Sequence, residues 1–598
     1  MTARGAGAVD QPGGIAYEPT FLEALQPALP HLRNHRIRLA VNAGASGTKA
    51  LHEAVCEMIA RARLDLTVAW ISGDEALPAI ESALASRSTA FVNLHTGVEL
   101  AAWQFKPIYG QAYLGGLGIA AAFKAGADIV VCGRVSDASP IVGAAAWWHG
   151  WNSSQLDYLA NALVAGHLIE CSSYVTGGNF SGFKAFEAGM WEELGYPIAE
   201  ISATGDVVLT KSKSSGGELS VATCTSQLLY EIQGPYYYNS DVTAVLDGIS
   251  FEQLSSNRVA LHGVKAMPPP PTTKVGITAR GGFQAEVHWF LVGLDIKAKA
   301  SMLEVQIRRA LSPYSSHFSL LAFTLNGSSP ENPSNQCAAT VDFRILVQAA
   351  SAEDIAPKKF ARPCIDVIMC TYPGATPHLD LRTAFPKPIY EYFVTLIPQT
   401  AIAHRVHLPF IAPDHVLTMP PPPLTHTFAA RQPSSPSTTA PLTTLSSSTL
   451  SKAADHAAGA WAELPARKGA SVLRESFGPW GRTVRAPLGW VVHARSGDKG
   501  SDANLGLWVR HAGEWDWLRS LLSVRKMKEL LADEYVPGRE IERFEIPGLL
   551  AVHFLLRDHL DRGVSCTSSY DALGKNVAEF VRARWVDVPV RFLERGRL

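Results

Sequence analysis

The sequence has no run of about 18 uncharged apolar residues, which is the length that a helix needs to cross a bilayer. Its first stretch, MTARGAGAVDQPGGIAYEP, lacks the apolar core of a secretory signal peptide. The eight cysteines are scattered without a CxxC pair, so we expect reduced thiols rather than a disulfide framework. These absences predict a cytoplasmic protein without a membrane partner.

A charge excess of either sign is also missing, because 53 Lys and Arg are matched by 54 Asp and Glu. No overall field draws the chain toward nucleic acid, so its partners must be recognised locally. A small-molecule substrate is the expected partner, and assembly into a homo-oligomer is compatible with the sequence. The dinucleotide fingerprint, the P-loop and the HExxH motif are all absent, so we predict no redox cofactor and no metal.

The length of 598 residues exceeds what one hydrophobic core organises, so at least two domains are expected. Residues 1–35 have no sustained periodicity and are predicted to be a partly ordered lead-in. Within residues 36–415, strands alternate with helices, as at 37–47 and 48–62. This pattern predicts a large α/β domain with a mainly parallel sheet, and the segments at 259–294 predict a mixed β-rich subregion within it.

A Ser/Thr/Pro-rich linker is predicted at residues 416–483. Its stretch 420–452 has too few aliphatic side chains to be buried, so we expect this stretch to be dispensable for folding. Residues 484–598 follow with short strands that bracket helical segments at 516–533 and 568–584. They predict a small α+β domain, and we expect the two domains to enclose one cleft.

The first glycine-rich loop follows the first predicted strand and precedes the first predicted helix. A helix that begins after Gly44 and Gly47 offers unpaired N–H groups to a phosphate or a carboxylate. The alternative is a tight turn without a ligand. Four residues of this loop are predicted to bind substrate: Gly44, Ser46, Gly47 and Lys49.

A second loop, 133–139, follows the buried strand DIVVC. Arg134 can hold a carboxylate through two parallel hydrogen bonds, and Asp137 can orient it or accept a proton. We predict that both are catalytic and that Ser136 and Ser139 bind substrate. The alternative is an Arg134–Asp137 pair that only closes the loop.

A third polar segment begins at Gly166. His167 is the predicted general acid or base, because imidazole exchanges a proton near neutral pH. Glu170 lies about one helical turn away and would share its pocket, whereas Cys171 is expected to be a small buried hydrophobe. A satisfied core histidine is the alternative. The residues predicted to bind substrate here are Glu170, Thr176, Gly177, Gly178 and Asn179.

The run 495–504 places an unusual density of polar residues between two predicted strands. Arg495 and Lys499 can hold an anion, and Asp498 can accept a proton. The alternative is a solvated, salt-bridged loop. We predict that Asp498 is catalytic, that His553 and His559 are structural, and that substrate is bound by Arg495, Ser496, Lys499, Asp502 and Asn504.

Long stretches of the chain resemble the acyclic terpene utilisation family. AYLGGLGIAAAFKAGADIVVCGRVSDAS (112–139), AGHLIECSSYVTGGNFSGF (165–183), GGELSVATCTSQLLYEIQGPYYYNSDVTA (216–244) and PPPPTTKVG (268–276) are similar to its N-terminal domain. VVHARSGDKGSDANLGLWV (491–509) is similar to its C-terminal domain, which is described as ferredoxin-like. At the first loop the family commonly shows Gly-Phe-x-Gly-Asp-Arg, whereas this chain has Thr48 and Lys49 at the last two positions.

The resemblance implies a role in the breakdown of branched or isoprenoid-like organic acids. That route runs on coenzyme A thioesters, so coenzyme A is expected only as part of a substrate. Hydration, elimination or carbon–carbon cleavage by a lyase or hydratase is the implied chemistry. The alternative is a non-catalytic ligand-binding or scaffold subunit of such a route.

Overall fold

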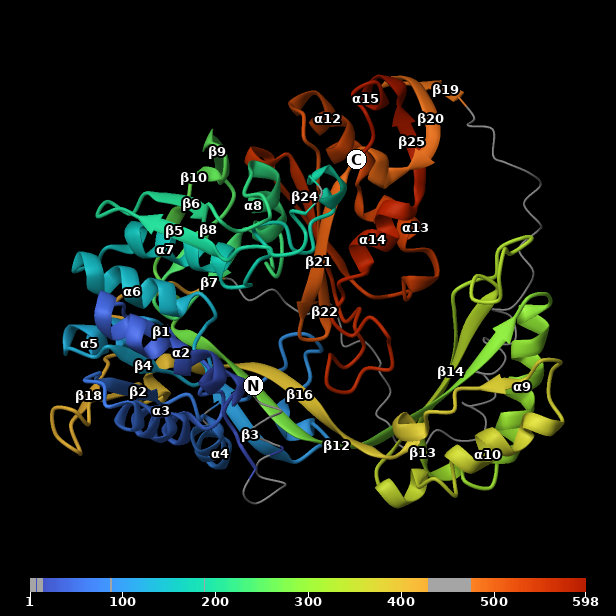
Figure 1. Cartoon of the computed structure of the whole chain (residues 1–598), viewed down its shortest axis with the longest axis horizontal. Helices are drawn as coiled ribbons and strands as arrows, with labels where there is room; N and C mark the ends of the chain where they lie inside the picture. Colours follow the sequence, from blue (N-terminus) through green and yellow to red (C-terminus); the bar gives the residue numbers. More distant parts are fainter. Residues whose placement is uncertain (1–6, 8–13, 87–88, 188, 429–474) are drawn as a thin grey trace. The chain divides into compact units, whose positions relative to one another are not determined.

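The computed structural model describes residues 7, 14–86, 89–187, 189–428 and 475–598 (Figure 1). The chain forms two compact units. Of the described residues, the first combines those up to 279, residues 392–428 and residues 475–598, and the second contains residues 280–391. Most of the predicted linker, including the part of 420–452 beyond residue 428, lies outside the described residues.

Part of the predicted lead-in is a helix, α2 (Thr20–His35). Its leucines at positions 25, 29 and 32 recur at helical spacing and are buried in one core with the helix α3. The helix predicted at 48–62 is α3 (Thr48–Ala62). The folded region therefore begins before the predicted boundary at residue 36.

The first sheet contains the strands that position the second polar loop. Its order is β1-β4-β2-β17-β18, in which β1 and β2 each pair with β4 in parallel and β17 pairs antiparallel with both β2 and β18. The carboxyl ends of three parallel strands thus lie at one edge. The bounds are β1 Leu39–Val41, β2 Val68–Ser72, β4 Ile129–Val131, β17 Arg405–His407 and β18 Val416–Thr418.

The prediction of a mainly parallel sheet is not confirmed, because the sheets of the described residues are largely antiparallel. Parallel neighbours need a long crossover, whereas most strands here follow one another through short connections. The first unit adds two antiparallel sheets: β5 (Pro197–Ile201), β6 (Val207–Lys211), β10 (Arg258–His262) and β9 (Ser250–Ser255), then β11 (Lys265–Met267), β8 (Thr243–Val245) and β7 (Tyr236–Tyr238).

Several apolar helices pack among these sheets. The core around them also includes Trp508, Ile546 and Ala551, which come from the carboxyl-terminal part of the chain. The first unit is therefore built from residues far apart in the sequence. The helices are α4 Leu77–Ala85, α5 Leu117–Lys124, α6 Ser139–His149, α7 Leu156–Ile169 and α8 Val221–Leu228.

The mixed β-rich subregion centres on one long strand, β12 (Thr272–Val292). Its first residues pair antiparallel with β3 (Pro107–Ala112) in the first unit. Its later residues pair with β14 in the second unit, where the helices α9 and α10 share a core with the strands. The bounds are β13 Phe318–Asn326, β14 Thr340–Ala349, β15 Thr376–Pro377, β16 Lys387–Pro398, α9 Ile296–Leu311 and α10 Ala361–Asp366.

The carboxyl-terminal part contains a four-stranded antiparallel sheet of order β21-β22-β24-β23, seen beside α8 in Figure 1. The predicted polar loop 495–504 is not a loop but the hairpin β21–β22, which turns at Gly500. Its polar side chains contact neighbouring segments, so they are compatible with strand structure. The bounds are β19 Glu475–Gly478, β20 Gly481–Pro487, β21 His493–Lys499, β22 Asp502–Trp508, α12 Ala512–Leu521, α13 Val524–Leu531, β23 Ile541–Ile546, β24 Ala551–Leu556, α14 Val577–Ala583, β25 Trp585–Pro589 and α15 Val590–Leu593.

Candidate functional site

Arg134 and Asp137 lie just beyond the carboxyl end of β4. The backbone N–H of Arg134 donates to Oδ2 of the buried Asp74 at 2.8 Å, which fixes the start of the loop. The guanidinium of Arg134 pairs with the Asp137 carboxylate. The Asp137 side chain nevertheless keeps 43% of its area exposed, so a ligand can reach this pair.

The aromatic ring of Tyr113 lies between two cations. The Arg134 guanidinium carbon is 4.2 Å from the ring centroid, and the Lys274 Nζ is 4.1 Å from it. The backbone N–H of Tyr113 donates to the Lys274 carbonyl at 2.9 Å, which holds the two residues side by side. We call Tyr113, Arg134, Asp137 and Lys274 the Tyr113 cluster.

The cations change the acidity of the phenol. Burial acts to raise the pKa of Tyr113, but Lys274 and Arg134 outweigh burial and lower this pKa to about 8. Burial lowers the pKa of Lys274, and the nearby Lys499 and Arg134 lower it further. The cluster therefore contains a phenol whose pKa lies near 8 and a lysine whose pKa is lowered.

The hairpin β21–β22 contributes a further cation next to this cluster. Lys499 Nζ lies 3.3 Å from Glu231 Oε2. Burial acts to lower the pKa of Lys499, but Glu231 and Asp137 outweigh burial and raise it. Glu231 has a left-handed φ of 56°, and its backbone N–H donates to Asn504 Oδ1 at 3.1 Å. The hairpin thus holds a strained residue in place.

Two glycines allow the hairpin to approach the segment after α8. A Cβ atom on Gly497 would lie 2.2 Å from the Tyr230 ring, and one on Gly506 would lie 2.6 Å from Leu229 Cβ. Asn504 Nδ2 donates to the Leu229 carbonyl at 2.7 Å. These contacts fix the register between the hairpin and residues 229–231.

Among the described residues, no carboxylate forms an ion pair with the buried Arg495. Only 4% of its surface is exposed, and its guanidinium carbon lies 4.5 Å from the ring centroid of Tyr174 and 4.3 Å from that of Tyr230. Nη1 donates to the Asn179 carbonyl at 3.2 Å, whereas Nη2 has no hydrogen-bond partner among the described residues. A buried cation without a counter-charge favours binding of an anionic ligand.

Asp498 follows on the same strand. Burial raises the pKa of Asp498 to about 6, and the Glu231 carboxylate contributes in the same direction. A carboxyl group with this pKa can both accept and donate a proton under physiological conditions.

His167 lies at the end of α7 with 1% of its surface exposed. Nε2 donates to the Leu228 carbonyl at 3.2 Å, and Nδ1 lies 3.3 Å from Glu170 Oε1. Burial raises the pKa of Glu170, which favours a proton between these two atoms. The predicted proximity of His167 and Glu170 is present, but the imidazole is enclosed by protein. Burial also raises the pKa of the nearby Cys171 thiol to about 12.

Several predicted substrate-binding side chains are engaged within the protein. Asp502 and Asn504 have no exposed area, and Asp502 accepts hydrogen bonds from His95 and Arg557 at 2.8 and 2.7 Å. Three further predicted hydroxyls also donate to protein carbonyl groups, namely those of Ser139, Thr176 and Ser496. Ser136 is half-buried, and its backbone N–H donates to the Leu114 carbonyl.

The first glycine-rich loop is connected to Arg134 through Asp74. Gln111 Nε2 donates both to Asp74 and to the Ala45 carbonyl, at 2.9 and 2.6 Å. A Cβ atom on Gly44 would lie 2.4 Å from the Cys132 carbonyl oxygen, so this turn requires glycine. Lys49 is 70% exposed and lies 3.9 Å from Glu53 on the surface of α3.

The remaining predicted positions of this loop, and those after α7, are backbone positions. Gly47 precedes α3, and Ser46 is half-buried next to Gln111. Gly177 has a φ of 124°, and the Gly178 backbone N–H donates to the Ser173 carbonyl. Asn179 contributes its carbonyl oxygen to Arg495, so the loop supports the arginine through its backbone.

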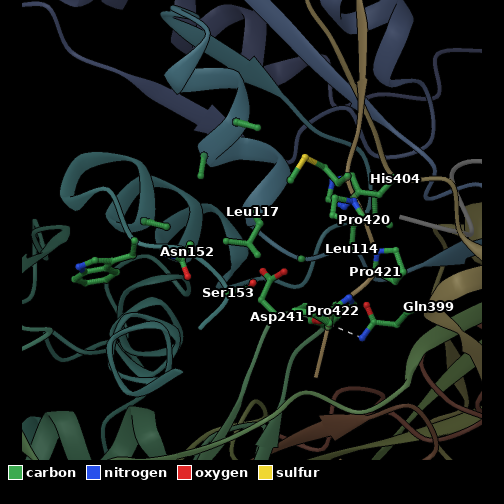
Figure 2. Close-up of a pocket in the computed structure, with 18 of the residues that line it drawn as sticks. Leu114, Leu117, Asn152, Ser153, Asp241, Gln399, His404, Pro420, Pro421 and Pro422 are labelled. Carbon is green, nitrogen blue, oxygen red and sulfur yellow. Dashed lines mark hydrogen bonds between the residues drawn. The ribbon is translucent and has the colours of Figure 1, made fainter. Parts of the chain in front are cut away.

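A separate cavity of about 650 Å³ lies behind Tyr113. Its lining includes Tyr113, whose carbonyl accepts hydrogen bonds from Ser240 and Thr273, but it does not include Arg134, Asp137 or Lys499. Figure 2 shows Leu117 and Asp241 on one side, with Gln399, His404 and Pro420–Pro422 on the other. Burial raises the pKa of Asp241 to about 6. Tyr113 is thus the residue of the Tyr113 cluster that also lines this cavity.

Groups of three His, Cys, Asp or Glu residues that could hold a metal ion do not occur within the described ranges. His95 pairs with Asp502. In that same part of the chain, no helix is long and apolar enough to cross a membrane.

Tyr113, Lys274 and Glu231 were not predicted from the sequence. Lys274 had a recognisable signal, because a lysine at the start of the apolar strand KVGIT is unusual for a buried strand. Tyr113 and Glu231 had none, because their importance arises from residues distant in the sequence.

Comparison with known proteins identifies the family. A family model described as acyclic terpene utilisation family protein AtuA matches residues 1–408, and a model of the AtuA ferredoxin-like domain matches residues 486–587. No curated protein and no solved structure matches the chain. Because the first model alone covers more than half of the sequence, the chain belongs to the acyclic terpene utilisation family, with a carboxyl-terminal ferredoxin-like domain.

Proposed function

We propose that the protein is an acid–base enzyme that acts on a branched organic acid or its coenzyme A thioester. The reaction is hydration, elimination or carbon–carbon cleavage, and Tyr113 transfers the proton. The observation that carries this proposal is the position of the Tyr113 ring between Arg134 and Lys274. Each of these reactions requires a proton-transfer group next to positive charge, because an oxyanion or a carbanion develops in the transition state.

Arg495 is proposed to bind the carboxylate of the substrate. Its burial next to two tyrosines and its unpartnered Nη2 among the described atoms support this role. A planar guanidinium matches a carboxylate better than an ammonium does, so Arg495→Lys should still weaken substrate binding. Asp498, with its raised pKa, is proposed as a second proton-transfer group.

His167 is proposed to position the site rather than to transfer the proton. Its enclosure and its hydrogen bond to Leu228 support this change from the sequence-based role. Asp137 is proposed to orient Arg134, since the two side chains are paired. Asp502 and Asn504 are proposed to hold the hairpin, because each is fully buried and engaged by protein groups.

Incubation with a panel of branched acids and their coenzyme A esters, followed by mass spectrometry, tests the proposal. Wild-type protein should convert at least one compound, and Tyr113→Phe should lower kcat/KM by about 10²- to 10⁴-fold. Tyr196→Phe is the matched control, because Tyr196 is 74% exposed. Equal activity of wild type and Tyr113→Phe would contradict the assigned role.

Non-catalytic ligand binding is the second candidate function, and the cavity behind Tyr113 favours it. Its apolar side chains, including Leu117, Trp147 and Met419, suit a ligand with a hydrocarbon chain. Ala120→Phe should fill this cavity. If wild-type protein binds a branched acid without converting it, and Ala120→Phe abolishes binding while Tyr113→Phe does not, the binding function is the correct one.

A further inference from the structure

We propose that Lys274 forms a covalent imine with the carbonyl carbon of the substrate, which makes the substrate an oxo acid. This inference rests on the proposed function and deepens it, because it uses the same cluster. It selects carbon–carbon cleavage or elimination next to a ketone or an aldehyde from the reactions proposed above.

The position of Lys274 is fixed by the sheet. Residue 275 pairs with Ala112 in the β12–β3 register, and the Lys274 carbonyl accepts the N–H of Tyr113. The side chain therefore starts beside Tyr113, and its Nζ lies 4.1 Å from the centre of the phenol ring. A nucleophile on a strand is held more precisely than one on a loop.

The ammonium of Lys274 has different neighbours from the ammonium groups of the other lysines near the site. Lys499 is paired with Glu231, and Lys575 donates to Tyr174 Oη at 2.7 Å. For Lys274, no carboxylate within ion-pair distance and no hydrogen bond of Nζ occurs in the part of the chain that the structure describes. Lys274 as a whole residue is half-buried.

The surroundings favour the neutral amine that imine formation needs. Burial is the main cause that lowers the pKa of Lys274, and the cations Lys499 and Arg134 act in the same direction. Tyr113 opposes them, yet the pKa remains below its ordinary value. Desolvation and neighbouring cations are known means of activating a lysine nucleophile.

The covalent step balances without a further reactant. The amine lone pair attacks the carbonyl carbon, a C–N bond forms, and the C=O electron pair moves to oxygen, which takes a proton from Tyr113. The nitrogen then passes a proton to the Tyr113 phenolate, Tyr113 returns a proton to the hydroxyl group, and the nitrogen lone pair forms the C=N bond as this group leaves as water. The resulting protonated imine accepts the electron pair of the adjacent C–C or C–H bond as that bond breaks.

Reductive trapping tests this inference. The protein is treated at neutral pH with 4-methyl-2-oxopentanoate, or with propanal as a small neutral probe, in the presence of cyanoborohydride. Peptide mapping should place the adduct on Lys274, formed on the order of tenfold faster than on the exposed Lys49. Lys499, which is paired with Glu231, is the matched control within the site and should stay unmodified.

Variants complete the test. Lys274→Met should lose the adduct, and its thermal midpoint should show that the variant is folded. The comparison of Lys274 with Lys49 and Lys499 is made within the wild-type protein, so it does not depend on the folding of any variant. If propanal modifies Lys274 no faster than Lys49, the inference is wrong. Tyr113→Phe separates the two proposals. If this variant loses turnover but Lys274 of the wild-type protein is not modified preferentially, only the acid–base proposal remains. If Lys274 is trapped and Tyr113→Phe keeps normal turnover, only the role of Tyr113 is overturned.

Discussion

The ammonium of Lys499 lies 3.3 Å from the carboxylate of Glu231, although the two residues are 268 positions apart in the chain. Both side chains are largely buried, so removal of one partner leaves an uncompensated charge. Lys499→Met should therefore lower the thermal midpoint. In the double variant, Glu231→Gln should lower the midpoint further by less than it does alone. Additive effects would show that the pair is not coupled.

The matched control for this pair is Lys265→Met. Lys265 lies 3.4 Å from Asp247, but both side chains are more than half exposed. Exposed ion pairs contribute about 0–1 kcal/mol, so this variant should leave the thermal midpoint almost unchanged.

The titration of Tyr113 should be visible without knowledge of the substrate. An ultraviolet difference titration of wild type against Tyr113→Phe should show a phenolate that forms near pH 8. Lys274→Met should move this transition upward, because a cation that stabilises the phenolate is lost. If Tyr113 acts as a base, kcat/KM should rise with pH and level off above about 8. A transition that Lys274→Met leaves in place would contradict the electrostatic explanation.

The close approach at Gly497 should not tolerate a methyl group. Gly497→Ala brings a Cβ atom to 2.2 Å from the Tyr230 ring, so the ring or the hairpin must move. Such overpacking costs about 1–3 kcal/mol, and activity should fall because Tyr230 also stacks on Arg495. Gly513→Ala is the control, since its nearest neighbour would be 3.9 Å away. Similar thermal midpoints for the two variants would show that the hairpin contact is not tight.

His288 should make the stability of the second unit depend on pH. The carboxylates of Asp342 and Glu286, which accept from the His288 ring, raise the pKa of His288 to about 9. A raised pKa stabilises the folded state fully below the unfolded value of about 6.5, and this stabilisation is lost as the pH rises through about 9. His288→Gln should thus increase hydrogen exchange in β14 at pH 6 much more than at about pH 10. His262 is more than half exposed, so the control variant His262→Gln should show no such dependence on pH.

Local patterns in the sequence predicted much of the secondary structure. The helix at residues 48–62 was predicted from apolar spacing alone, and the strand that precedes Arg134 was recognised from its aliphatic residues. The sheet type was not predictable in this way. A buried strand shows the same composition whether its neighbour runs parallel or antiparallel, and the long strand β12 looked like two separate segments.

The candidate site was only partly accessible to the same reasoning. Arg134 was recognised because it follows a buried strand, and Arg495 because it belongs to the dense polar run 495–504. The environment of Tyr113 was not, since it depends on Lys274, which pairs through β12 with a strand more than a hundred and fifty residues earlier. Long-range pairing, not residue type, gives this tyrosine its acidity.

The pairing of Lys499 with Glu231 has a consequence for the order of events during synthesis. A nascent chain that has emerged as far as residue 428 contains Glu231, Asp137 and the whole Tyr113 cluster, but not the hairpin. Until Lys499 leaves the ribosome, these carboxylates must remain hydrated. Closure of the site is therefore among the last steps in the life of the nascent chain, and a prematurely terminated product cannot acquire a finished site.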